Sequence, residues 1–251
     1  MKRKVFVMAL LTVMTVTTAN AQKDDSQWTL NTRAWSTNYF TSMIGGAINF
    51  LITDVILDSD ESDSLTVDRI LPFPSLVFPV GMKKDGFDDP YDIYGPYHRA
   101  FSNPFKHIGD YAVGLDVSWQ PSTIGFYAGA YFKSQEIVYK NEPRDGDNIR
   151  GFYFQPRAGL SFGGAKSTFE VGVFYDIPTG CTSTSLANPD KDILKEGLGL
   201  DFAFTNFDKG DPTSLTLQFS MPLHDMFKEN RGPGLGKRRV GYIMLTRRIK
   251  L

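Results

Sequence analysis

The sequence is poor in the residues that form disulfides and zinc sites. Its 251 residues include one cysteine, Cys181, so the chain cannot form an internal disulfide. The chain has only three histidines in addition to this cysteine, and zinc sites are built mainly from these two residue types. We therefore predict no metal site, and we predict no cofactor. The fold must therefore be held together by something other than disulfide bonds.

The sequence also lacks an excess of charge of either sign. It has 27 lysines and arginines against 28 aspartates and glutamates, which gives a formal net charge of −1. A nucleic-acid-binding domain is expected to be basic, so we predict no nucleic-acid partner.

Long apolar helices are missing as well. A helix that crosses a bilayer needs about 20 apolar residues. The best candidate, residues 43–57, is short and contains Asn49 and Asp54. Aromatic residues nevertheless make up 14% of the chain, and there are 23 glycines. This combination is typical of transmembrane strands, because only alternate residues of such strands face lipid.

The N-terminus has the pattern of a secretory signal peptide. Lys2-Arg3-Lys4 is followed by an apolar run over residues 5–16 and by Ala19-Asn20-Ala21. We expect cleavage after Ala21, so that residues 1–21 form the signal peptide. The next residue is Gln22 and not cysteine, so a lipid anchor is not expected. Loss of three positive charges moves the formal net charge from −1 to −4.

The clearest pattern in the chain is a predicted hairpin over residues 149–178. Two alternating strands flank the turn Gly163-Gly164-Ala165-Lys166, and each strand has one apolar face and one small or polar face. The polar faces carry Arg157 and Glu170. We predict that the apolar face meets lipid. Its members are Phe152, Phe154, Pro156, Ala158, Leu160, Phe162, Phe169, Val171, Val173, Tyr175 and Ile177.

Residues 22–64 have no such regularity, and we treat them as an N-terminal periplasmic or plug segment. Residues 22–42 support no assignment. Apolar spacing over residues 44–57 favours a short helix, with an extra strand as the alternative, because Gly45-Gly46 interrupts the pattern. The acidic run 58–63 lacks the glycine and distant glutamate of a calcium loop, so we take it as a solvated loop.

The remaining chain, residues 65–251, predicts a barrel of eight strands. The first, at 65–82, is irregular because it contains Pro72, Pro74 and Pro79. Ten strands remain the alternative, should residues 38–57 add a hairpin. The regular strands are expected at 108–120, 124–133, 149–162, 169–177, 197–205, 215–223 and 239–251.

The connections between these strands alternate between long and short. Transmembrane barrels have short periplasmic turns and longer extracellular loops, so this alternation predicts a membrane barrel with both chain ends in the periplasm. Tyr111, Tyr175 and Tyr242 would lie near the outer rim, and Trp119 and Phe169 near the inner rim. The competing fold is a soluble β-sandwich or lipocalin-like barrel, in which the apolar faces point inward. Many glycines, alanines and serines on the non-apolar faces favour a narrow lumen instead.

In this architecture the chain resembles the small outer-membrane β-barrel proteins of Gram-negative bacteria, of the eight-stranded OmpA or OmpX kind. The resemblance covers residues 65–251 and includes a last strand with alternate apolar residues, Ile243, Leu245, Ile249 and Leu251. The series departs from the family at Arg247 and at its end, where the family commonly has an aromatic residue. The resemblance implies an all-β, antiparallel up-and-down transmembrane barrel in the outer membrane. It also implies outer-membrane lipid and the barrel assembly machinery as partners.

The inward-facing side chains are the candidate functional residues. An eight-stranded barrel has a lumen about wide enough to be filled by side chains. Buried charges need partners, so we expect Arg157 to pair with Glu170 or Asp201 from a neighbouring strand. Such a network either fills the lumen or gates a narrow pore. Its predicted members are Asp110, Asp116, Lys133, Arg157, Glu170, Asp176 and Asp201.

Two loop features complete the predictions. The first long loop carries Tyr91, Tyr94, Tyr97 and Phe101, which suit contact with a sugar or protein or form a plug over the mouth. A hydrolytic triad would combine a histidine with Ser102 and a carboxylate. No family spacing is matched, so we predict no catalytic residues; the histidines and carboxylates concerned are His98, His107, His224, Asp88 and Asp225.

The leading hypothesis is therefore an outer-membrane barrel with a structural or surface-binding role exerted through its extracellular loops. The alternatives are a small pore or uptake channel and an envelope lipid hydrolase or acyltransferase. An open water path through the lumen would favour the pore. A histidine, serine and carboxylate within hydrogen-bond reach at lipid level would favour the enzyme. The sequence leaves the surface ligand open.

Overall fold

The chain folds almost entirely into β-strands. The computed structural model describes residues 28–44, 47, 65–67, 70–72, 76–83, 108–121, 123–138, 147–164, 167–184, 191–207, 213–228 and 238–250. The predicted signal peptide lies outside these residues. The elements are β1 (Trp28–Ser36), β2 (Leu65–Val67), β3 (Ile70–Pro72), β4 (Leu76–Lys83), β5 (Tyr111–Trp119), β6 (Ile124–Val138), β7 (Asn148–Gly164), β8 (Ser167–Ser183), the 3₁₀ turn η1 (Lys191–Ile193), β9 (Gly197–Phe207), β10 (Thr213–Pro222) and β11 (Arg238–Lys250).

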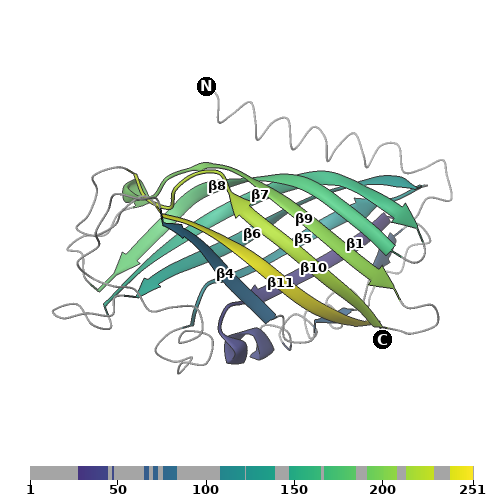
Figure 1. The fold of residues 1–251 in the computed structure, drawn as a ribbon, viewed down its shortest axis with the longest axis horizontal. Coiled ribbons are helices and arrows are strands. Elements are labelled where there is room, and N and C mark those ends of the chain that lie inside the picture. The colour runs from purple at the N-terminus through teal and green to yellow at the C-terminus, as the bar shows by residue number, and fades with distance from the viewer. Residues whose placement is uncertain are drawn as a thin grey trace.

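Eight long strands follow one another in antiparallel order, β1-β5-β6-β7-β8-β9-β10-β11. This confirms the predicted all-β, antiparallel up-and-down architecture. Figure 1 shows the sheet curled, with β4 lying alongside β11. Short turns join β5 to β6, β7 to β8 and β9 to β10, and we call the rim that holds them the short-turn end. The opposite rim, where β6 ends and β7 begins, is the long-loop end.

The first strand of the sheet is not the one that the sequence predicts. β1, from the segment left unassigned, pairs with β5 along its whole length from Trp28↔Trp119 to Ser36↔Tyr111. The predicted first strand, 65–82, is split into β2, which pairs with β1, and into β3 and β4, which pair with β11 at the other edge. Proline has no backbone N–H, and Pro72 and Pro79 therefore fit strands that pair on one side. The sheet thus begins before the predicted boundary at Leu65.

The same segment closes the barrel at the short-turn end. β2 pairs in parallel with β1 over Leu65–Val67, and β3, which starts three residues later at Ile70, pairs with β11. One short stretch of chain is therefore hydrogen-bonded to both edges of the curled sheet. Inside the barrel, the ring of Trp35 on β1 lies 4.7 Å from the ring of Tyr242 on β11.

Burial alternates along the strands, and the apolar faces point outward. Leu160 on β7 is 50% exposed, whereas its inward-facing neighbour Arg157 is 2% exposed. The exterior is therefore apolar and the interior polar, as predicted for the hairpin 149–178. We call the exposed apolar side chains of β5 to β10 the exterior band: Val113, Leu115, Ile124, Phe132, Phe154, Leu160, Phe162, Phe169, Val173, Leu198, Phe202, Phe204, Leu215, Leu217 and Phe219.

Two glycines let large rings lie flat against the inner wall. A Cβ on Gly172 would overlap the Tyr127 hydroxyl, and a Cβ on Gly199 would overlap the Phe174 ring. Both rings therefore occupy space that the side chain of any other residue at these two positions would fill. The glycines predicted to face a narrow lumen serve this packing.

The short helical stretch begins earlier than predicted. Residues 39–44 are helical, and Asn38 caps them, because its Oδ1 accepts hydrogen bonds from the amides of Phe40 (3.0 Å) and Thr41 (3.1 Å). Apart from Ile44 and residue 47, the predicted helix at 44–57 falls outside the described residues, as does the acidic run 58–63. Among the helices of the described residues, none is long and apolar enough to span a membrane.

Candidate functional site

The seven side chains predicted to face the lumen all come from the strands that line it or from the residue before β5. Six of them are buried, and Glu170 on β8 is half-buried. They do not form one uniform network. The structure divides them into a cluster around Arg157, a cluster around Asp176, and a set of hydrogen bonds from Asp110 across the barrel.

Arg157 on β7 lies between two carboxylates and two aromatic rings. Its Nε is 3.6 Å from Asp116 Oδ1 on β5, and its Nη2 is 3.4 Å from Asp201 Oδ2 on β9. The guanidinium also lies 4.7 Å from the centre of the Tyr131 ring and 5.1 Å from that of Tyr127. Of the two partners expected from the sequence, Asp201 is the one that contacts Arg157. Asp116 is a second partner, and it also accepts a hydrogen bond from the Tyr131 hydroxyl (2.8 Å).

Both carboxylates lie two strands away from Arg157 around the sheet. A flat sheet would hold them too far apart, but the curvature of a narrow barrel turns the three side chains toward one another. The arrangement is a buried cation shared between two anions, so the group as a whole has one negative charge in excess. Glu170, the other predicted partner, lies half-buried on β8.

Asp176 on β8 is the centre of the second cluster. Its Oδ2 is 2.6 Å from Lys133 Nζ on β6, and its Oδ1 accepts a hydrogen bond from Gln155 Nε2 on β7 (2.8 Å). The Lys133 ammonium also lies over the rings of Tyr153 (5.1 Å) and Phe174 (5.6 Å). The third side chain that contacts the Asp176 carboxylate belongs to a histidine outside the strands.

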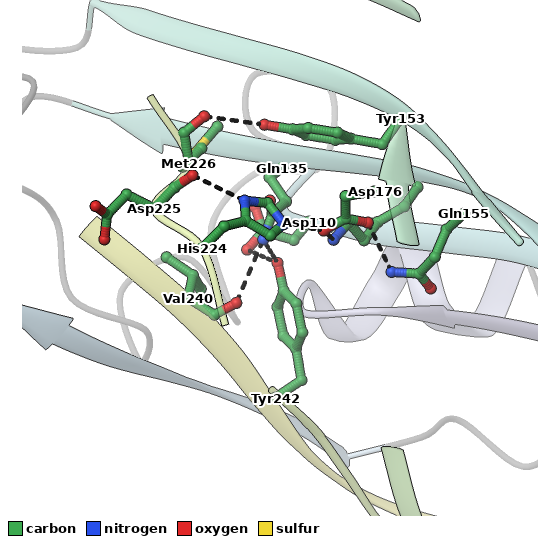
Figure 2. A network of polar contacts seen from close by, with 11 residues as sticks. Asp110, Gln135, Tyr153, Gln155, Asp176, His224, Asp225, Met226, Val240 and Tyr242 are labelled. Carbon is green, nitrogen blue, oxygen red and sulfur yellow. Dashed lines mark hydrogen bonds and ion pairs between the residues drawn. The ribbon is translucent and has the colours of Figure 1, made fainter. Parts of the chain in front are cut away.

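That histidine is His224, just beyond β10. Its Nε2 is 3.2 Å from Asp176 Oδ2, and its Nδ1 is 2.9 Å from the backbone carbonyl oxygen of Asp225 (Figure 2). A carbonyl and an ionised carboxylate can only accept hydrogen bonds. Both ring nitrogens of His224 therefore face hydrogen-bond acceptors of the protein itself.

His224 belongs to a segment that folds back into the mouth of the barrel. We call residues 223–228 the strap. Four successive strap residues, at 224–227, are buried. The strap is tied to the region of η1 by hydrogen bonds from Lys195 N to Met226 O (2.9 Å) and from Lys228 N to Ile193 O (2.9 Å). Its apolar members join a cluster that fills the mouth, formed by Ile137, Ile149, Tyr153, Leu194, Met226 and Phe227.

The third part of the site crosses the lumen from β5 and β6 to β11. The Tyr242 hydroxyl donates to Asp110 Oδ2 (3.0 Å) and accepts from Gln135 Nε2 (2.6 Å) (Figure 2). Asp110 Oδ1 accepts from the backbone amide of Glu136 (2.6 Å). The two bonds of the Tyr242 hydroxyl connect strands that are not paired with each other in the sheet, so they brace the barrel from within.

A further ion pair lies on the opposite face of the same strands. Arg150 Nη2 is 2.9 Å from Glu136 Oε1, and Arg150 Nη1 donates to Ser134 Oγ (2.9 Å). Ser134 and Glu136 alternate with the inward-facing Lys133 and Gln135 along β6, so they face outward at the long-loop end. The sequence did not predict this pair, because β6 continues to Val138, beyond the predicted strand end at residue 133.

His224 and Asp225 are described, but they do not form a triad with a serine. His224 binds Asp176, and the buried Asp225 carboxylate lies 3.3 Å from Nε of Arg239, whose side chain is 41% exposed. The other residues considered for a triad, His98, His107, Ser102 and Asp88, lie outside the described residues. So do the loop aromatics Tyr91, Tyr94, Tyr97 and Phe101. Within the described part of the chain, no cluster of histidine, cysteine, aspartate and glutamate has the arrangement of a metal site.

An apolar exterior, a curled antiparallel sheet and a lumen filled with paired charges together define an up-and-down β-barrel of the class found in outer membranes. No family model and no curated protein matches the sequence. Among solved structures, the chain is similar to one described as the crystal structure of a Pseudomonas aeruginosa FadL homologue. The two are 15% identical, and the match covers 56% of this chain with a TM-score of 0.32. The matched part spans 36%, about a third, of that structure's length.

Proposed function

We propose that this protein is an outer-membrane β-barrel with a closed lumen, and that its role is structural or surface-binding and is exerted through the connections at its long-loop end. The observation that carries the proposal is the inversion of polarity across the barrel wall. The exterior band is apolar and exposed, while buried charges occupy the interior.

The exterior band supports a membrane location on energetic grounds. Exposed apolar patches on soluble monomers rarely exceed a few hundred Å². Here large side chains that are 37–57% exposed recur along successive strands β5 to β10. Lipid removes the cost of this exposure, and a closed barrel is one of the two folds that satisfy every backbone hydrogen bond in a bilayer. Outer-membrane lipid is therefore the proposed surrounding, and the barrel assembly machinery the proposed route of insertion.

The interior supports a closed barrel over an open channel. Arg157, Lys133 and their carboxylate partners extend into the lumen from opposite sides, and the strap fills the long-loop end. With the lumen occupied, a contact surface must lie on the loops. The predicted surface is the group Tyr91, Tyr94, Tyr97 and Phe101, in the loop between β4 and β5.

The geometry does not favour an envelope lipid hydrolase at His224. A general base needs a ring nitrogen free to take a proton from a nucleophile. Both nitrogens of His224 face acceptors within the protein, namely Asp176 and the Asp225 carbonyl. The histidine is therefore engaged in holding the strap, and neither ring nitrogen is directed at a nucleophile of the described residues.

The test is membrane fractionation combined with gel mobility before and after heating. We expect the protein in the outer-membrane fraction, with a mobility that changes on boiling because the intact barrel is compact. We also expect no steady conductance in planar bilayers at neutral or acidic pH. Release as a soluble periplasmic protein without a mobility shift would overturn the membrane assignment. A stable open channel would overturn the closed lumen and favour the pore.

A further inference from the structure

The segment that follows β1 is a short helix in a stretch of sequence without charge. Residues 39–44 and 47 are helical. Between Arg33 and Asp54 the sequence has no lysine, arginine, histidine, aspartate or glutamate. The surface of this helix is therefore made only of apolar and neutral polar side chains.

Exposure divides the helix into two faces. Phe40, Met43 and Ile44 are 48%, 49% and 56% exposed, and Ala47 is exposed as well. The spacing i, i+3, i+4, i+7 places these four residues on one side of a helix, and we call them the apolar helix face. Ser42, between them in the sequence, is 4% exposed and faces the protein. In a soluble protein the apolar stripe of a surface helix faces the core, whereas here it faces away from the protein.

The start of the helix is fixed to the barrel wall at the long-loop end. The amide of Thr37 donates to Asp110 O (2.8 Å), and the amide of Asp110 donates to Thr37 Oγ1 (2.8 Å). Ser36 Oγ donates to Ile108 O (3.2 Å). Gly109 between them has a φ of 79°, and a Cβ there would lie 2.7 Å from Thr37 Oγ1. The two chain segments are therefore in close contact, and the wall sets where the helix begins.

The apolar helix face continues the exterior band. Val113 of that band is 48% exposed and pairs with Ala34, shortly before the helix. Ile108, which is bonded to Ser36, is 42% exposed. Figure 1 shows the helix, in purple, projecting outside the outline of the strands near the end of β1. If lipid surrounds the exterior band, the same lipid therefore reaches this face on the long-loop side.

We propose that the apolar helix face lies in the outer membrane, at the boundary between acyl chains and headgroups on the long-loop side, and fixes the depth of the barrel there. The inference rests on the proposed membrane barrel and adds a lipid contact outside the strands. Interfacial helices bury their apolar face about 5–10 Å into this boundary. Lipid is favoured over a protein partner because residues 34–53 supply no charged group for the polar rim of a protein interface, and because the neighbouring surface is the exterior band.

The test reads the surroundings of single positions with an environment-sensitive fluorophore attached to cysteine. Cys181→Ser removes the native thiol. Phe40→Cys, Met43→Cys and Ile44→Cys then each place one label on the apolar helix face. The whole protein is folded into vesicles of phosphatidylcholine that is brominated on its acyl chains, and gel mobility checks that each variant is folded. Bromine quenches a label in lipid, and dissolved iodide quenches a label in water.

Two control positions calibrate the result. Leu160→Cys places a label in the exterior band, and Lys191→Cys places one at an exposed position on η1. We expect bromine to quench the three helix labels to within about twofold of the Leu160 label, and iodide to quench them about fivefold less than the Lys191 label. Ile44→Glu puts a charge into the face and should lower the bromine quenching of the Met43 label about twofold or more, whereas Ile44→Leu should leave it unchanged.

Three results would overturn the lipid contact of the helix. Iodide quenching as strong as at Lys191 would place the face in water. Shielding from both quenchers would show that protein covers it, and unchanged quenching in Ile44→Glu would show that the face does not depend on its apolar character. In each of these cases bromine quenching at Leu160 shows that the barrel itself is in the membrane. Loss of quenching at Leu160 refutes the proposed function, and the inference with it.

Discussion

Replacement of Arg157 by methionine is expected to destabilise the barrel far more than the loss of an ordinary ion pair. Arg157 is 2% exposed and lies 3.6 Å and 3.4 Å from two buried carboxylates. At an effective dielectric constant of about 20, each contact represents roughly 5 kcal/mol of attraction before solvation is considered. Methionine also removes the desolvation cost of the guanidinium, so the expected net loss is about 3–5 kcal/mol.

The argument depends on the charges that remain, and a compensated variant tests this. Asp116→Asn and Asp201→Asn, combined with Arg157→Met, leave a neutral cluster of similar volume. Because buried ion pairs can be replaced by neutral groups at little cost, the triple variant should recover most of the loss, to within about 1–2 kcal/mol of the native free energy of unfolding. Arg239→Met is the matched control, since its pair with Asp225 is 41% exposed on the arginine side and should contribute less than about 1 kcal/mol.

The measurement is equilibrium unfolding in denaturant of protein folded into lipid vesicles, followed by tryptophan fluorescence and by gel mobility. The reasoning is refuted if Arg157→Met unfolds at the native denaturant concentration. It is also refuted if the triple variant is as unstable as the single one, because the loss would then come from packing and not from uncompensated charge.

Three further predictions use the same unfolding assay. Gly129→Ala should cost about 1–3 kcal/mol, because a Cβ there overlaps the backbone of β5, whereas Gly180→Ala should be close to neutral, because its Cβ finds an ordinary 3.6 Å contact; equal stabilities would contradict the inner-wall packing. Tyr242→Phe removes both hydrogen bonds of the hydroxyl and should cost about 1–3 kcal/mol, and no change would show that the bonds across the lumen are dispensable. Leu160→Arg introduces a charge into the exterior band and should cost about 2–4 kcal/mol, with Leu160→Ile as its control; a soluble, stable Leu160→Arg would contradict the lipid-facing assignment.

Most of the barrel wall was predictable because its signal is local. Alternation of apolar and polar residues is visible within each strand, and it places the hairpin at 149–178 close to the observed β7 and β8 (Asn148–Gly164 and Ser167–Ser183). The direction of the faces was also predictable, since small residues and charges on one face fit a narrow lumen. The strand ends were not, because β6 to β8 extend past the apolar pattern at the long-loop end.

β1 was not predictable, because its place depends on a partner far away in the sequence. Trp28–Ser36 pairs with Tyr111–Trp119, and nothing in the mixed composition of the first segment identifies that partner. The prolines of residues 65–82 did indicate an irregular strand. They did not indicate that the segment divides between the two edges and that β3 and β4 pair with β11.

For the candidate site, the sequence predicted which residues face inward but not which of them meet. Side chains alternate between the two faces along a strand, and this alternation identifies the residues that face inward. All seven predicted residues lie on the inward face or at the end of a strand. Partner choice depends on the curvature of the barrel, which brings Asp116 and Lys133 to partners two strands away. His224 was assigned to a loop because the alternation of apolar and polar residues ends with β10. The strap returns into the mouth without any regular spacing of apolar residues, so the sequence does not show this return.

The orientation of the strands explains why the bonds across the lumen matter. β5 and β11 are separated by an even number of antiparallel steps, so they run in the same direction. β1 is antiparallel to β5, and β4 is antiparallel to β11, so β1 and β4 also run in the same direction and cannot form an antiparallel pair. At the β1 edge the backbone pairing is instead the short parallel contact of β2 with β1, while β3 pairs with β11 at the other edge. A parallel ladder is slightly less stable per residue than an antiparallel one. Tyr242 on β11, which contacts Trp35 of β1 and is bonded to Asp110 and Gln135, therefore reinforces from inside the part of the wall where the backbone ladder is shortest.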